Sequence, residues 1–168
     1  MKINVGSGPY PLEGFINVDL YYPAQRADNA VALATFEANS ADEIMASHIL
    51  EHLGVHEAPI ALARWHEVLQ PGGLITVKVP NIVLTIRRWL EYYEANDPRL
   101  WGFRSQGLWG TQVHPGEHHR WGYDERLLRQ LLAQTGFEDI TIQFDLVWDQ
   151  DSNEMLPLGL MATARKAK

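Results

Sequence analysis

Short hydrophobic runs alternate with helical stripes along this chain, and their order predicts an α/β fold. Strands are expected at about residues 2–6, 15–19, 29–33, 43–47 and 74–79, the last being an apolar run suited to the centre of a parallel sheet. Near the C-terminus, residues 137–148 and 158–164 predict a closing pair of strands. The pattern therefore indicates a mostly parallel sheet with right-handed crossovers and an antiparallel closing strand.

Three helices are predicted where apolar residues recur at helical spacing. The first begins near Pro59 and ends at the Pro-Gly-Gly of residues 71–73. Asn81 and Asp124 can cap the other two, and Gly136 ends the last one. The three apolar stripes are Leu62, Trp65 and Leu69; Ile82, Ile86, Trp89 and Tyr93; and Leu127, Leu128, Leu131 and Leu132.

Composition fits one compact domain spanning residues 1–168. Hydrophobic residues make up 46% of the chain, and no apolar run is long enough to cross a membrane. A net charge of −7 opposes non-specific binding of nucleic acid, and the lack of cysteine excludes a disulfide framework. The first strand begins at once, which leaves no room for a signal peptide, so a cytoplasmic protein is expected.

The most informative segment is a glycine turn, in which Ile3–Gly8 is followed by the strand Phe15–Asp19. Glycines let the backbone approach a ligand, and their amides can point at it. Asp19, at the tip of the second strand, can accept hydrogen bonds from both hydroxyls of a ribose. The dinucleotide fingerprint needs a third glycine and an acid about 20 residues further on, whereas Tyr10 stands here and Asp19 follows Gly8 closely. The spacing fits an adenosine-type ligand of another class, although the glycines alone favour an ordinary glycine turn between two strands.

Further motifs follow this turn in a fixed order. The chain resembles a small bacterial S-adenosylmethionine-dependent methyltransferase of the class I, type-11-like kind, through the strings at residues 4–8, 14–19, 46–53, 67–73, 121–124 and 133–137. The resemblance covers nearly the whole chain. It implies a reduced Rossmann-like class I methyltransferase fold, S-adenosyl-L-methionine as cofactor and a small-molecule acceptor.

Three connections that carry helices in the class I fold have no helical pattern here, namely residues 8–15, 20–29 and 36–43. One face of the sheet should therefore lack its usual cover. Because large exposed apolar patches are uncommon on monomers, either the segment 81–121 or a second subunit is expected to shield it. A homodimer is the resulting expectation.

The resemblance also implies a set of cofactor contacts. Gly6 and Gly8 would face the methionine end of the cofactor and Asp19 its ribose. The remaining expected contacts are Val5, Ser7, Leu20, Leu33, Ser47 and His48. Where relatives often carry an acid for the adenine amino group, Ala32 stands in this chain, which leaves adenine to backbone groups and apolar contacts.

Histidines are the expected catalytic groups, because an alcohol acceptor must lose its proton and histidine is the likeliest base at neutral pH. His48 lies at the end of a strand, and His114, His118 and His119 cluster with Glu117. A solvated polar loop is the alternative for that cluster. The aromatic residues expected to stack on an acceptor, or else to cover the bare sheet face, are Trp101, Phe103, Trp109 and Trp121. The segment 81–121 is thus expected to be an acceptor-site insertion.

The string His48-Ile49-Leu50-Glu51-His52 also matches an inverted zinc-protease motif. Two histidines four residues apart on one helix could ligate zinc, but this string emerges from a strand, so no metal is expected. The favoured function is methyl transfer to a small acceptor, with a sugar or glycan-precursor hydroxyl as the leading guess. A non-catalytic S-adenosylmethionine-binding or dimerisation module and a zinc hydrolase are the alternatives.

Overall fold

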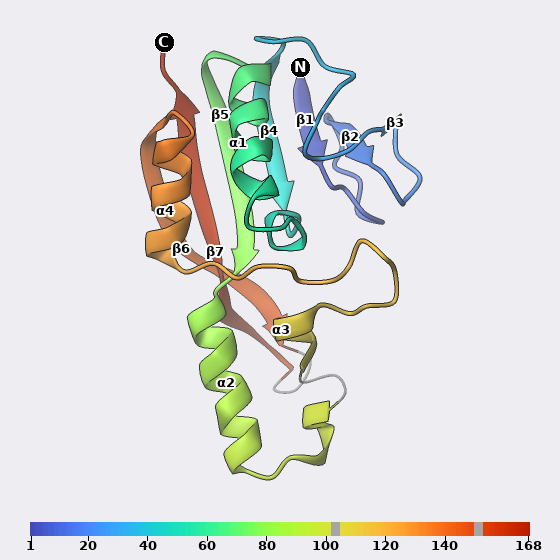
Figure 1. Ribbon diagram of the computed structural model, residues 1–168, viewed down its shortest axis with the longest axis vertical. Coiled ribbons are helices and arrows are strands. Elements are labelled where there is room, and N and C mark those ends of the chain that lie inside the picture. The colour runs from blue at the N-terminus through green and yellow to red at the C-terminus, as the bar shows by residue number, and fades with distance from the viewer. Residues whose placement is uncertain (102–104, 150–152) are drawn as a thin grey trace.

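One seven-stranded sheet organises the molecule, in the order β3-β2-β1-β4-β5-β7-β6. The computed structural model describes residues 1–101, 105–149 and 153–168. Strands β1 to β5 pair in parallel, while β7 runs antiparallel to both β5 and β6 (Figure 1). The predicted α/β class, the mostly parallel sheet and its antiparallel closing pair are confirmed.

The elements largely follow the predicted order. The strands are β1 (Lys2–Val5), β2 (Ile16–Asp19), β3 (Arg26–Ala27), β4 (Ala41–Ser47), β5 (Leu69–Pro80), β6 (Phe137–Asp149) and β7 (Glu154–Lys166). The α-helices are α1 (Glu57–Val68), α2 (Ile82–Glu94), α3 (Gln106–Trp109) and α4 (Glu125–Gln134), and the 3-10 helices are η1 (Leu50–His52) and η2 (Pro98–Trp101). Asn81 and Asp124 cap α2 and α4 as predicted, since each side chain accepts a hydrogen bond from an amide in the first turn.

Helices α1 and α4 lie on the same side of the sheet (Figure 1). Alternate residues of the strands point toward them, and these residues form the main core with the apolar stripes of the two helices. Trp65 is fully buried at the centre of α1, and its indole N–H donates to Ala30 O at 2.7 Å. The core therefore ties α1 both to the sheet and to the loop that follows β3.

The opposite face of the sheet is polar where helices are missing. No helix occurs in residues 6–15, 20–25 or 28–40, which confirms the predicted loss of the early crossover helices. The strand residues that point to this face include the ion pairs Lys2–Glu43 and Lys78–Asp145 and the hydrogen-bonded hydroxyls of Thr141 and Thr163. The expectation that a bare apolar face needs a cover is therefore wrong, because this face presents charged and hydroxyl groups to water.

The third strand lies earlier than predicted. It is β3, residues 26–27, whereas the predicted segment 29–33 forms tight turns. Asn29 directs these turns: its side chain accepts from the Val31 amide at 2.7 Å, and its carbonyl accepts from the amides of Ala32 and Leu33. An asparagine that binds its own backbone two residues on favours a turn over an extended strand.

Helix α2 projects beyond the carboxyl edge of the sheet (Figure 1) and contains no fully buried residue. Its exposed apolar residues are Val83, Ile86, Leu90 and Tyr93, which recur at helical spacing. The predicted stripe on this helix thus exists in sequence, but it does not enter the core. Among the described residues, no helix is long and apolar enough to cross a bilayer.

Two glycines with positive φ allow a direct test of the turn after β1. Gly6 (φ +66°) and Gly14 (φ +79°) share a backbone conformation that disfavours a Cβ, but only at Gly6 would that Cβ lie 2.6 Å from the Ile49 side chain. We expect Gly14→Ala to lower the free energy of unfolding by about 1–2 kcal/mol and Gly6→Ala to lower it further by about 1–3 kcal/mol through overpacking. Urea unfolding of both variants measures this difference. Equal losses would show that the contact with Ile49 is not tight.

Candidate functional site

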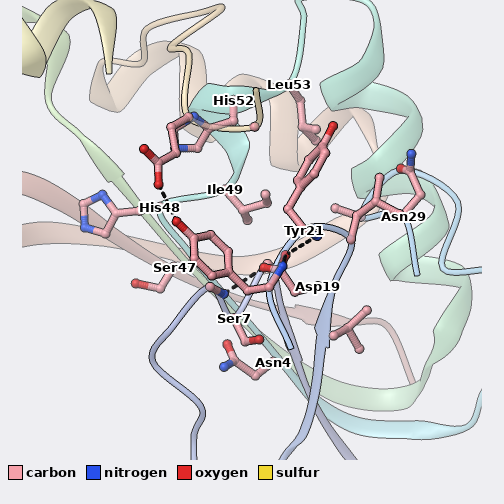
Figure 2. A pocket seen from close by; sticks show the side chains of 18 of the residues that line it. Asn4, Ser7, Asp19, Tyr21, Asn29, Ser47, His48, Ile49, His52 and Leu53 are labelled. Carbon is pink, nitrogen blue, oxygen red and sulfur yellow. Dashed lines mark hydrogen bonds between the residues drawn. The ribbon is translucent and has the colours of Figure 1, made fainter. Parts of the chain in front are cut away.

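A pocket of about 720 Å³ opens at the carboxyl ends of β1, β2 and β4 (Figure 2). Ligands of open α/β sheets bind at this edge. The lining comes from the glycine turn after β1, the end of β2, residues 28–31, the turn from β4 into η1, and part of the segment 114–120. Segments far apart in the sequence thus meet around one cavity.

Asp19 holds the base of this pocket together. The side chain is only 8% exposed, and its Oδ2 accepts from the Gly8 amide at 2.8 Å. Its Oδ1 accepts from the amides of Tyr21 at 2.8 Å and Tyr22 at 2.9 Å. A carboxylate has about four lone-pair sites, so these three bonds leave one for a ligand hydroxyl. Asp19 was predicted to accept from both hydroxyls of a ribose; as it stands, its carboxylate has an unoccupied acceptor site for one hydrogen bond.

The glycine turn provides space rather than amide donors. The amides of Gly6 and Ser7 both donate to Val18 O, at 2.9 and 3.0 Å, and the Gly8 amide donates to Asp19. The expectation that these amides point at a ligand is therefore wrong. A Cβ at Gly8 would meet nothing within 4 Å, so the backbone there leaves open space on the pocket side.

An acidic residue does follow the third strand. The expectation was that Ala32 stands at the position where relatives often carry that acid. Asp28 comes directly after β3 and is 8% exposed, and it accepts from the amide and hydroxyl of Thr35, both at 2.8 Å. Partial burial favours its neutral form, but the hydrogen bonds from Thr35 and Asn29 outweigh this and lower the pKa of Asp28. Residues 28–31 line the pocket, whereas Ala32 does not.

His48 stands at the end of β4 in a left-handed conformation (φ +53°), which is uncommon for a residue other than glycine. Its Nδ1 lies 3.2 Å from Glu51 Oε1, and this contact with the carboxylate raises the pKa of His48, although burial acts in the opposite direction. Ser47 and His48 both line the pocket and are labelled in Figure 2. The strained turn therefore places an oriented imidazole at the cavity wall.

The loop after α3 closes one side of the pocket by packing on two tyrosines. The His114 ring meets Tyr21 edge-on at 4.8 Å and stacks on Tyr22 at 5.4 Å between centroids. The Tyr22 hydroxyl donates to Glu117 Oε1 at 2.7 Å, and the Thr111 hydroxyl bonds the other oxygen of that carboxylate. These hydrogen bonds, led by that of Thr111, lower the pKa of Glu117, and the bond to Glu117 raises the pKa of Tyr22.

Most of the site residues predicted from sequence meet at this cavity. The pocket is lined by Gly6, Ser7, Gly8, Asp19, Leu20, Ser47, His48, His114 and His118. Three predicted residues do not line it: Val5 and Leu33 are fully buried in the core, and the Nδ1 of His119 lies 3.2 Å from Gly107 O. Side chains alternate across a strand, and that of Val5 points to the core face of β1. The turn at Asn29 directs the Leu33 side chain into the core. Neither side chain therefore faces the pocket.

The aromatic lining differs from the expected one. Trp109 and Trp121 are exposed and lie outside the pocket. The side chain of Trp101 and the whole of Phe103 lie outside the described residues. The aromatic residues of the pocket are instead Tyr10, Tyr21 and Tyr22, which the sequence reasoning missed. The signal in the sequence is that Tyr10 lies two residues after Gly8, and that Tyr21 and Tyr22 lie two and three residues after Asp19.

The His48–His52 string does not form a helix with both rings on one face. It is a turn followed by η1, and the Nδ1 of His48 faces Glu51. Within the described residues, the ligand atoms that converge belong to Glu51, His52 and His119, which lie within 4.8 Å of one another. The zinc-protease interpretation of the string therefore has no support in the geometry.

Comparison with known proteins agrees with this architecture. Residues 11–142 match the family described as methyltransferase domain. Comparison with curated proteins gives no match. Among solved structures, the chain is similar to a SAM-dependent methyltransferase from Archaeoglobus fulgidus (15% identity, 98% of this chain and 85% of that chain, TM-score 0.65) and to one from Methanosarcina mazei (16%, 99% and 92%, 0.67).

A third similar structure is the 1,6-didemethyltoxoflavin-N1-methyltransferase of Burkholderia thailandensis, solved with 1,6-didemethyltoxoflavin and S-adenosylhomocysteine bound (19% identity, 99% of this chain and 71% of that chain, TM-score 0.63). These likenesses establish the fold, and the family match extends over most of the sheet and the pocket. The chain therefore belongs to the methyltransferase-domain family and shares the class I fold of these S-adenosylmethionine-dependent methyltransferases.

Proposed function

We propose that this protein transfers a methyl group from S-adenosylmethionine to a small-molecule acceptor, with a sugar-type hydroxyl as the leading class. The observation that carries the proposal is the meeting of the Gly6–Gly8 turn, Asp19 and His48 around one cavity at the strand ends. A volume of about 720 Å³ lies within the range of small-molecule pockets.

The residues present fit the cofactor. Asp19 keeps one acceptor site for a ribose hydroxyl, and the open space at Gly8 accommodates close approach of a ligand. When bound, S-adenosylmethionine supplies an electrophilic methyl group on a sulfonium, which is already a good leaving group. The chain's task is then to bind it and to align a nucleophile with that methyl.

The loop after β3 is the proposed adenine side of the pocket. Asp28 is held by Thr35, and Arg64 of α1 bonds the carbonyls of Ala32, Leu33 and Phe36. These bonds fix residues 28–31 as a wall of the cavity. A flat base can rest against Ala30 and Val31 while the Asn29 side chain reaches its polar edge.

The acceptor side is proposed to lie between His48 and the segment 114–118. His114 and His118 line it from the loop, and Tyr21 and Tyr22 offer the faces on which a sugar or an aromatic ring can stack. Only the second half of the proposed insertion at 81–121 reaches the pocket, because no residue of α2 lines it. The acceptor is therefore selected by the loop that packs on the two tyrosines.

His48 is the proposed base. Glu51 orients its ring through Nδ1, which leaves Nε2 as the atom available to an acceptor hydroxyl. This pairing follows the general arrangement in which a second group orients the catalytic base. His114 and His118 are the remaining histidine candidates, whereas His119 does not line the cavity.

The direct test of the proposal is release of S-adenosylhomocysteine from S-adenosylmethionine in the presence of sugars, phenols and amines. Release with one sugar class would support the proposal. Tight binding of S-adenosylhomocysteine with no turnover on any class would favour a non-catalytic binding module instead.

Cofactor binding should depend on Asp19. We expect Asp19→Ala to weaken the binding of S-adenosylhomocysteine by about 1.5–3 kcal/mol, because a hydrogen bond to a charged group is lost and the glycine turn loses its anchor. Asp42→Ala is the matched control, since Asp42 pairs with the N-terminus at the far end of β4. Calorimetry compares the two folded variants. Unchanged affinity in Asp19→Ala would contradict the ribose assignment.

Turnover should depend on His48 much more strongly than cofactor affinity does. We expect His48→Asn to lower kcat about 100-fold while leaving the dissociation constant of S-adenosylhomocysteine nearly unchanged, because a base acts in the transition state. His114→Ala and His118→Ala show whether either loop histidine shares the role, and the exposed His56→Ala is the control. If His48→Asn keeps full turnover, the base is one of the loop histidines.

We also propose a homodimer, through the exposed stripe of α2 rather than through the polar sheet face. A stable contact buries about 1,200–2,000 Å² in total. Ile86→Glu should shift the protein to monomers in light scattering across a dilution series, whereas Val113→Glu, at an 87% exposed position outside α2, should not. A monomeric wild type at tens of micromolar would contradict the proposal.

A further inference from the structure

We infer that Glu51, His52 and His119 form a binding site for a divalent transition-metal ion. One ligand atom from each of the three side chains lies within 4.8 Å of the others. Two come from η1 at the end of β4, and the third comes from the distant loop before α4. This inference goes beyond methyl transfer and does not depend on it, because metal binding is measured without turnover.

The first observation that points to an ion is the environment of the Glu51 carboxylate. The residue is 2% exposed, and its Oε1 lies 3.2 Å from His48 Nδ1. Its Oε2 is buried and has no hydrogen-bond partner. A buried carboxylate oxygen without a partner loses its hydration and gains nothing in return, which is costly for a charged group. A cation at this oxygen would remove that cost.

The two imidazoles are the second observation, because both are already held in the form that binds metals. His52 Nδ1 lies 3.1 Å from His118 O, and His119 Nδ1 lies 3.2 Å from Gly107 O. A carbonyl oxygen only accepts, so each Nδ1 carries a proton, and in the neutral imidazole the lone pair that binds a metal lies on Nε2. A metal-ligating histidine almost always donates its other ring N–H in this way, and the partner fixes the ring.

The three ligand atoms need to approach one another only slightly to bind one ion. Ligand atoms at about 2.0–2.2 Å from a tetrahedral zinc ion lie about 3.4 Å apart. The separations here reach 4.8 Å, so modest side-chain rotations bring the three atoms to a common centre. The rings of His52 and His119 already meet edge to face, with 5.0 Å between their centroids.

The donor set selects the ion. Two imidazoles and one carboxylate suit zinc, cobalt or iron, whereas magnesium and calcium prefer oxygen ligands alone. Three protein ligands leave a coordination position open. His52 also lines the large pocket (Figure 2), so an ion at this site would sit at the pocket wall.

An ion here would also fasten the loop over the pocket. The backbone amides of Arg120 and Trp121 donate to Glu51 O at 2.8 and 3.2 Å, so the loop is already attached next to the site. The Arg120 guanidinium adds an ion pair to Glu57 at 2.5 Å. A metal bond through His119 would join the same two segments more strongly, which makes loop closure depend on the metal.

The test uses the full chain, purified without a histidine tag and stripped with a chelator. We expect calorimetry to find one equivalent of Zn²⁺, and Co²⁺ to give the visible absorption of a low-coordinate N/O site. Glu51→Gln, His52→Ala and His119→Ala should each weaken Zn²⁺ binding more than about tenfold, because loss of a supporting partner alone costs 10–100-fold. His56→Ala, on the exposed start of α1, is the matched control and should bind like wild type.

Stability gives a second measurement. Zn²⁺ should raise the Tm of wild type and of His56→Ala, and should raise the Tm of the three ligand variants clearly less. Circular dichroism without metal establishes that each variant is folded, and Glu51→Gln keeps the shape of the buried side chain. The inference is overturned if wild type binds no Zn²⁺ at millimolar concentration. It is also overturned if the three variants bind as tightly as wild type, or if His56→Ala weakens binding as much as they do.

Discussion

The Asp19 carboxylate is the constraint on which the site depends. Three backbone amides converge on it: one from the glycine turn after β1 and two from the tyrosines after β2. It therefore fixes the pocket base and, through Tyr21 and Tyr22, the surface on which the loop carrying His114 and Glu117 packs. One buried carboxylate joins the cofactor side of the cavity to its proposed acceptor side.

The fold tolerates the loss of three crossover helices because the uncovered sheet face is polar. Ion pairs such as Lys2–Glu43 and Lys78–Asp145 need no apolar cover. The strand sequences contained this information. In β5, for example, Thr76 and Lys78 alternate with Ile75, Val77 and Val79, which indicates one polar and one apolar face. The absence of these helices therefore does not by itself call for a covering subunit.

Local features could be predicted from the sequence, and long-range ones could not. The caps Asn81 and Asp124 follow from short-range rules, and the order of strand and helix patterns indicates the parallel sheet. The third strand was misplaced because the Asn29 side chain favours turns over an extended strand. The direction of the glycine amides, and the position of His119 beside Glu51, depend on contacts between distant segments that no local pattern encodes.

The central claim is that the cavity at the strand ends holds the nucleoside of the cofactor. A crystal structure with S-adenosylhomocysteine tests it most directly. The account predicts a ribose hydroxyl within about 2.5–3.0 Å of Asp19 Oδ2, the adenine beside residues 28–31, and the sulfur facing His48. A nucleoside bound elsewhere, or an Asp19 carboxylate still in contact only with backbone amides, would contradict it.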